Sequence, residues 1–92
     1  MSIKFKLKLY VVGATDRSMA IVKNIKNMLN VDHANLYSLE VIDAVKQPKL
    51  AKNDNVLVMP TLIKTSPLPV VRIVGDLSDR GKVLAGLGLV VV

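Results

Sequence analysis

The order of hydrophobic periods in the first half of the chain restricts its possible folds more than any other feature. Apolar and charged side chains alternate from residue 4 onward, and residues 6–12 are predicted to form a strand. Thr15 or Asp16 can then cap a helix, and the next apolar positions recur at the spacing of one helical face: Ile21, Val22, Ile25, Met28 and Leu29. Residues 36–42, rich in Leu, Val, Ile and Tyr, predict a second strand. Such a unit predicts two parallel strands joined by a right-handed crossover.

The second half predicts a short helix, a hairpin and a closing helix. Pro48 suits the first turn of the short helix. Apolar and extended residues lie on both sides of a turn that contains two prolines, so residues 56–74 predict an antiparallel hairpin. The closing helix is expected from about Leu77, with Asp76 or Ser78 as its cap. Its buried stripe is predicted to contain Leu77, Val83, Leu84 and Leu87.

This element order, βαβ followed by αββα, is that of an α/β domain of the thioredoxin-like class. We expect a mixed four-stranded sheet and a single domain over residues 1–92. In this fold Pro60 precedes the antiparallel strand, so a cis bond is expected before it, facing the end of the first helix. A chain of 92 residues is long enough to bury one core without disulfides.

The chain lacks the groups that thioredoxin-type catalysis needs. It has no cysteine, and residues 13–18, where the reactive thiol would stand, contain none. Ser18 would need a base to act as a nucleophile, and the single histidine, His33, lies beyond the helix. Asp76 and Asp79 fit the start of a helix better than a catalytic pair, and the scattered carboxylates lack metal-ligand spacing. We therefore expect no enzyme activity, no cofactor and no metal site.

The charge balance favours an acidic partner. Thirteen basic residues against seven acidic ones give a net charge of +6, which suits nucleic acid or an acidic protein surface. Ten of the basic residues are lysines and only three residues are aromatic, which disfavours base readout and base stacking. A solvated cationic surface is the simpler interpretation. No apolar run is long enough for a transmembrane helix or a secretory signal, so a cytoplasmic protein is expected.

Several short motifs point to one family. The most specific are Pro-Thr-Leu at residues 60–62 and Gly-Asp-Leu-Ser at residues 75–78. Further matching segments lie at residues 7–11, 39–43, 46–51, 67–70, 72–80 and 82–87. In these motifs, which cover about residues 6–89, the chain resembles the KaiB family of circadian clock proteins.

The resemblance implies a non-enzymatic binding protein. KaiB-like proteins bind the N-terminal ATPase ring of the clock ATPase KaiC, sequester the activator KaiA and displace a sensor histidine kinase with a thioredoxin-like input domain. The resemblance also implies two folds for one sequence, a tetrameric ground state and a monomeric thioredoxin-like state. We expect the monomeric state, because Ala85 and Gly88 offer less surface for tetramer packing than the residues usual in the family. The homotetramer is the alternative.

The resemblance places partner binding on cations of the second half: Lys46, Lys49, Lys52, Lys64 and Arg72. Structural and fold-switching roles fall on Pro60, Gly75, Asp76, Ala85, Gly86 and Gly88. Cations usual in the family are absent at three positions: Ala20, Asn55 and Val71. These departures leave open a second interpretation, a thioredoxin-like adaptor for another kinase or ATPase outside a clock. A basic nucleic-acid binder is the third.

Overall fold

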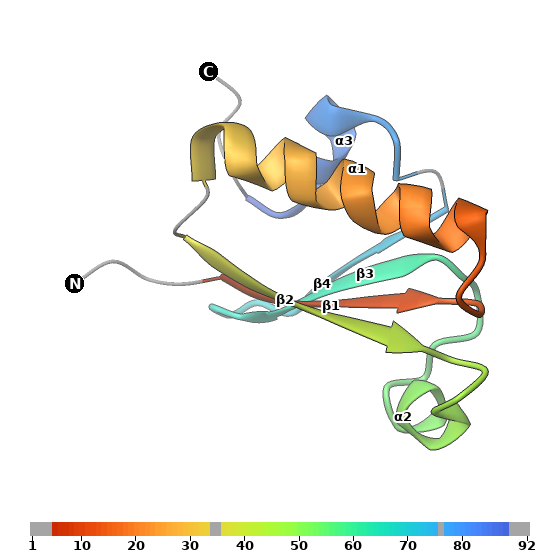
Figure 1. Cartoon of the computed structure of the whole chain (residues 1–92). Helices are drawn as coiled ribbons and strands as arrows, with labels where there is room; N and C mark the ends of the chain where they lie inside the picture. Colours follow the sequence, from red (N-terminus) through yellow and green to blue (C-terminus); the bar gives the residue numbers. More distant parts are fainter. Residues whose placement is uncertain (1–4, 34–35, 76, 89–92) are drawn as a thin grey trace.

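The computed structural model describes residues 5–33, 36–75 and 77–88. Along the chain the elements are β1 (Phe5–Val11), α1 (Asp16–His33), β2 (Tyr37–Asp43), α2 (Pro48–Asn53), β3 (Thr61–Ser66), β4 (Val71–Val74) and α3 (Arg80–Gly86). The strands form one mixed sheet in the order β2-β1-β3-β4, in which β1 and β2 are parallel and the other pairs are antiparallel. Helices α1 and α3 cover one face, and α2 lies on the opposite side (Figure 1). This is the thioredoxin-like arrangement that the sequence predicted.

Strand β1 lies between β2 and β3, and its last residues are apolar on both faces of the sheet. Leu7 and Leu9 point to the face under α1 and α3, whereas Tyr10 points to the α2 face, and all three are buried. The strand ends at Val11, one residue earlier than predicted, and Val12 is half exposed. β1 therefore contributes to the cores on both sides of the sheet.

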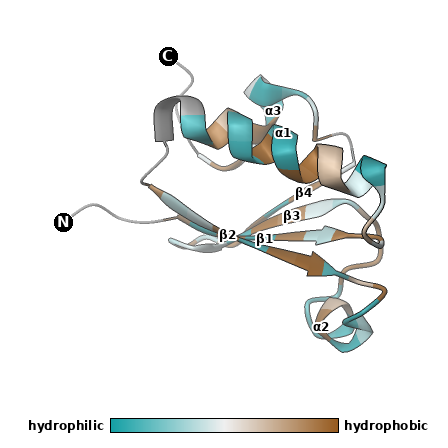
Figure 2. Cartoon of the chain, viewed as in Figure 1, coloured by the Kyte–Doolittle hydropathy of each residue, from teal (hydrophilic) through white to brown (hydrophobic). Residues whose placement is uncertain are grey.

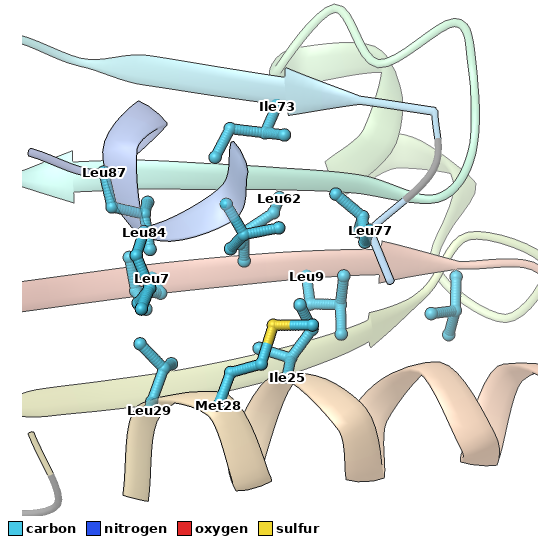
Figure 3. Packing of buried hydrophobic residues seen from close by; sticks show 12 residues of the cluster. Leu7, Leu9, Ile25, Met28, Leu29, Leu62, Ile73, Leu77, Leu84 and Leu87 are labelled. Carbon is cyan, nitrogen blue, oxygen red and sulfur yellow. The ribbon is translucent and has the colours of Figure 1, made fainter. Parts of the chain in front are cut away.

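The larger core fills the space between the sheet and the helices α1 and α3 (Figure 3). It contains Leu7, Leu9, Val11, Ile25, Met28, Leu29, Leu62, Ile73, Leu77, Val83, Leu84 and Leu87. The apolar stripes predicted for both helices are confirmed, and Figure 2 shows polar residues along the outer side of α1. A smaller core holds α2 against the opposite face and contains Tyr10, Ile42, Ala51, Val56 and Ile63.

The connection from α2 to β3 differs from the prediction. Residues 56–59 form no strand, and β3 begins only at Thr61. Val56 is buried in the smaller core and its backbone N–H donates to the last turn of α2, which keeps the chain in a turn. The next two residues, Leu57 and Val58, are exposed. The hairpin therefore consists of β3 and β4 alone.

Helix α3 also begins later than predicted. Its cap is Asp79, whose Oδ1 accepts a hydrogen bond of 3.0 Å from the backbone N–H of Lys82. The expected cap at Ser78 is therefore wrong, because the first turn starts two residues further on. Asp76, the other expected cap, lies outside the described residues.

The second half has the secondary structure of the thioredoxin-like state. Residues 61–66 form a strand and residues 80–86 form a helix, whereas the alternative state predicted a helix across 60–70 or a strand across 77–87. The bond before Pro60 is cis as predicted, and those before Pro67 and Pro69 are cis as well. The monomeric state stays a prediction.

Two of the structural glycines have a physical reason in this fold. Gly75 ends β4 with φ of 98°, a conformation that L side chains rarely adopt. A Cβ atom on Gly86 would lie 2.8 Å from Cδ1 of Ile73, so α3 approaches β4 closely at this point. Ala85, in contrast, is exposed on α3.

Candidate functional site

The predicted partner-binding cations do not form a single surface. Lys49 and Lys52 are exposed on α2, and neither makes an ion pair with any described residue. Lys46 is also exposed, but it borders a groove of about 580 Å³ between α1 and β2. Lys49 and Lys52 therefore share one exposed helix, whereas Lys46 lies apart from them at the groove.

Arg72 extends this cationic surface from the edge of the sheet. It lies opposite Ile63 in the β3–β4 register, so it shares the α2 face with the smaller core. Its guanidinium donates to the backbone carbonyl of Asn55 at 3.2 Å and to that of Asp54. These bonds fix the turn after α2 to strand β4.

Lys64 occupies a different environment from the other four cations. Its exposed fraction is 6%, and its Nζ lies 5.6 Å from the centroid of the Phe5 ring. It is paired in register with Leu7 and Val71, on the face under α1 and α3. A cation–π contact of this kind stabilises the charge within the fold. Partner binding by Lys64 stays a prediction.

A polar network that sequence reasoning missed connects the sheet to α2. The Tyr10 hydroxyl donates to the Asp54 carboxylate and lies 3.1 Å from the Leu50 carbonyl oxygen. Lys8 Nζ lies 3.3 Å from Asp54 Oδ2 in an ion pair. The only hint in the sequence was a tyrosine among the lysines of one strand face.

The network changes the acidity of its members. The Tyr10 hydroxyl bond, followed by the bond from Lys8, holds the pKa of Asp54 below its ordinary value of 3.8, although burial acts in the opposite direction. Burial and the Asp54 carboxylate raise the pKa of Tyr10 above its ordinary range. Asp54 is therefore a carboxylate at neutral pH and Tyr10 is a donor.

The turn before α1 uses its hydroxyls for structure. Thr15 Oγ1 accepts from the Ser18 N–H at 3.1 Å and so caps α1 as predicted, and Ser18 Oγ donates to the Val12 carbonyl at 3.0 Å. Pro60 and the start of α1 line one cavity of about 150 Å³, so this proline faces the helix end as expected. The part of the chain that the structure describes contains no cluster of three potential metal ligands.

The positions that lack the usual family cations lie in different surroundings. Ala20 is exposed on α1, and Asn55 is exposed with φ of 54° in the turn bound by Arg72. Val71 is half-buried and packs against the larger core. Across the described residues, no helix is long and apolar enough to cross a membrane.

Solved structures with similar folds include thioredoxins and the N-terminal domain of SasA. The N-terminal domain of Synechococcus elongatus SasA superimposes with a TM-score of 0.79, covering 96% of this chain and 87% of that chain at 29% identity. Mitochondrial thioredoxin 3 from Saccharomyces cerevisiae gives a TM-score of 0.71, covering 94% of this chain and 78% of that chain at 13% identity. The thioredoxin comparison supports the fold alone.

Sequence comparison identifies much closer relatives. The circadian clock oscillator protein KaiB of Synechococcus elongatus is 55% identical over 83 residues, which cover 90% of this chain and 81% of the relative. KaiB of Picosynechococcus is 51% identical over 85 residues, covering 92% of this chain and 82% of the relative. The profile of the KaiB domain matches residues 8–89. The chain therefore belongs to the KaiB family of circadian clock proteins.

Proposed function

We propose that this protein is a non-enzymatic clock component that binds the N-terminal ATPase ring of KaiC, sequesters KaiA there and competes with a sensor histidine kinase. The observation that carries this proposal is the family membership over residues 8–89. The likeness to the SasA N-terminal domain, with a TM-score of 0.79, supports competition because two domains of one shape can occupy one site. We also propose that the protein acts in the cytoplasm, where it meets these partners.

The direct test is binding to the isolated N-terminal ring of KaiC. The fluorescently labelled chain would be titrated with the KaiC ring from Synechococcus elongatus. The positive control is the same titration with labelled KaiB of that organism, which is 55% identical to this chain. We expect saturable binding that the N-terminal domain of SasA reverses. A properly folded chain that does not bind, beside a control that does, would reject the proposal.

The absent family cations support one alternative, an adaptor for another kinase or ATPase. Asn55 is exposed beside the α2 surface, at a position where the family resemblance implies a lysine. An adaptor of this kind would fail to bind the KaiC ring and would instead bind a different ATPase or kinase. Nucleic-acid binding is excluded if the chain causes no salt-dependent shift of DNA or RNA in a gel.

Charge reversal at Lys49 and Lys52 is expected to slow association with the KaiC ring. Both lysines are exposed on α2, and rim charges act mainly through encounter rate and salt dependence. The double substitution Lys49→Glu/Lys52→Glu should lower the association rate roughly tenfold at low salt and much less at high salt. Stopped-flow fluorescence over a range of salt concentrations would measure this effect.

The matched control is Lys23→Glu/Lys26→Glu, which makes the same charge change on exposed positions of α1. Helix α1 lies on the opposite face of the sheet (Figure 1). Equal slowing by both double variants would mean that only net charge matters and would contradict a docking surface at α2.

A further inference from the structure

The groove of about 580 Å³ between α1 and β2 has no role in the function proposed above. It opens at the edge of the sheet, because β2 is the outer strand beneath α1 (Figure 1). On the helix it is lined by one stripe at helical spacing: Met19, Val22, Lys23, Lys26, Asn27 and Asn30. This stripe runs beside the buried stripe of the same helix and faces solvent.

The groove changes in character along α1. Towards the start of the helix it is aliphatic, and we call Met19, Val22 and Val41 its aliphatic end. Met19 is 64% exposed and Val41 is 42% exposed, so both present apolar surface to a ligand. Further along the helix it is polar, and we call this part the cationic end: Lys23, Lys26, Asn27 and Asn30.

The charges of the groove are unevenly distributed. Lys23 and Lys26 are exposed, and neither makes an ion pair with any described residue. The groove also contains the Asp43 carboxylate, but β2 ends there, beside the start of α1 and away from the cationic end. The Asp43 Oδ1 accepts from two backbone N–H groups at 2.9 Å, and Lys46 lines the groove as well. The cationic end therefore attracts an anion.

An amide at the cationic end can add a hydrogen bond to this attraction. The Tyr37 hydroxyl donates to Asn30 Oδ1 at 2.8 Å, which fixes the orientation of the side-chain amide. The NH₂ group of Asn30 makes no hydrogen bond to any described residue, so it can donate to a carboxylate. A carboxylate accepts several such bonds at once.

The lining also restricts the apolar part of a ligand. Among the described residues that line the groove there is no aromatic side chain, so a ring would find nothing to stack on. From Met19 to Asn30 the helix rises about 16 Å, which accommodates an extended chain of about ten carbons with its head group. The shape and the lining thus fit a flexible aliphatic chain.

We propose that the groove binds a medium-chain aliphatic carboxylate, with its head group at the cationic end and its chain along the aliphatic end. The charge selects an anion, and the exposed aliphatic side chains select a ligand that can cover them. The site lies on the face of α1, apart from the lysines of α2, and it does not depend on the proposed function.

The test titrates decanoate, below its micelle concentration, into the isotopically labelled chain and follows the backbone amides by NMR. We expect saturable shifts along the groove side of α1 and β2 and none in α2. Octanoate should bind more weakly, by about twofold to fourfold for each methylene removed, because each buried methylene contributes to the affinity. Acetate should cause no shift. Absence of shifts along the groove with decanoate, or equal binding of acetate, would overturn the proposal.

Two double charge reversals separate the groove from the overall charge. Lys23→Glu/Lys26→Glu should raise the Kd for decanoate at least tenfold. The matched control, Lys49→Glu/Lys52→Glu, makes the same change at the same spacing on exposed positions of α2 and should alter the Kd less than twofold. Equal weakening by both would mean that only net charge attracts the ligand, and the proposal would be wrong.

A third variant, Met19→Gln, examines the aliphatic end without changing the charge. Met19 is so exposed that the thermal unfolding curve should coincide with that of the wild-type chain. We expect the Kd for decanoate to rise about threefold and the difference between decanoate and octanoate to become smaller. Unchanged affinity and chain-length dependence would contradict the placement of the chain along this end.

Discussion

Replacing Leu84 by alanine is expected to lower the free energy of unfolding by about 2–5 kcal/mol. Leu84 is fully buried in the larger core, where α3 packs against the sheet (Figure 3). Helix α3 has only seven residues, and such a short helix depends on tertiary packing for its stability. The loss should therefore be in the upper part of that range. Urea unfolding followed by circular dichroism would measure it.

Lys82→Ala is the control for this substitution. Lys82 is exposed in the same helix, and alanine has a high helix propensity, so the change should stay within about 0.5 kcal/mol. If Leu84→Ala were as stable as Lys82→Ala, this would contradict the packing of α3 against the sheet.

Tyr10→Phe is expected to lower the free energy of unfolding by about 1.5–3 kcal/mol at neutral pH, because a buried hydroxyl then no longer donates to a charged carboxylate. Tyr10 is fully buried, and its hydroxyl bonds both Asp54 and the Leu50 carbonyl. The control is Tyr37→Phe, which removes a bond of 2.8 Å from an exposed site to the neutral side chain of Asn30. This control should cost well under 1 kcal/mol.

The effect of Tyr10→Phe should depend on pH. A carboxyl whose pKa is lowered by folding stabilises the protein fully above its ordinary pKa, and this contribution is lost as the pH falls through the lowered value. The ordinary pKa of Asp54 is 3.8. The difference in the free energy of unfolding between wild type and Tyr10→Phe should therefore have its full size at neutral pH and become smaller below pH 3.8. Asp43 also has a lowered pKa, caused first by the Val45 N–H, but it titrates alike in both proteins. A difference independent of pH would assign the stabilisation to the Leu50 carbonyl instead.

Regular periodicity made most of the fold predictable. The alternation in β1 and the helical spacing in α1 each describe a surface that one element buries. Strand β1 forms within one residue of the predicted bounds, but α1 continues past the last residue of its apolar stripe and includes His33, which was wrongly expected beyond the helix. The strand predicted from residue 56 was wrong, because four adjacent apolar residues show no alternation that would distinguish a strand from a turn. Only Val56 of that run is buried, and its anchoring in the smaller core depends on residues far away in the sequence.

The candidate site was less predictable than the fold. Tyr10 and Asp54 are 44 positions apart, and nothing local in either segment indicates that they meet. Lys64 could have been assigned better, because Leu62 two residues earlier points into the larger core and a strand repeats its facing at every second residue. The family resemblance assigned Lys49 and Lys52 to partner binding; both are exposed on α2, and their role in binding stays a prediction.

The position of β1 between β2 and β3 has a consequence for synthesis on the ribosome. Its parallel neighbour β2 begins at Tyr37, but its antiparallel neighbour β3 begins only at Thr61. The edge of β1 that binds β3 therefore stays unpaired while the intervening residues are synthesised. At roughly 5–20 residues per second the wait lasts a few seconds, during which a nascent strand edge can pair with another chain. Lys6 and Lys8 lie along that edge, and lysines discourage such pairing. We therefore expect the alternating lysines of the first strand to disfavour such pairing in the growing chain.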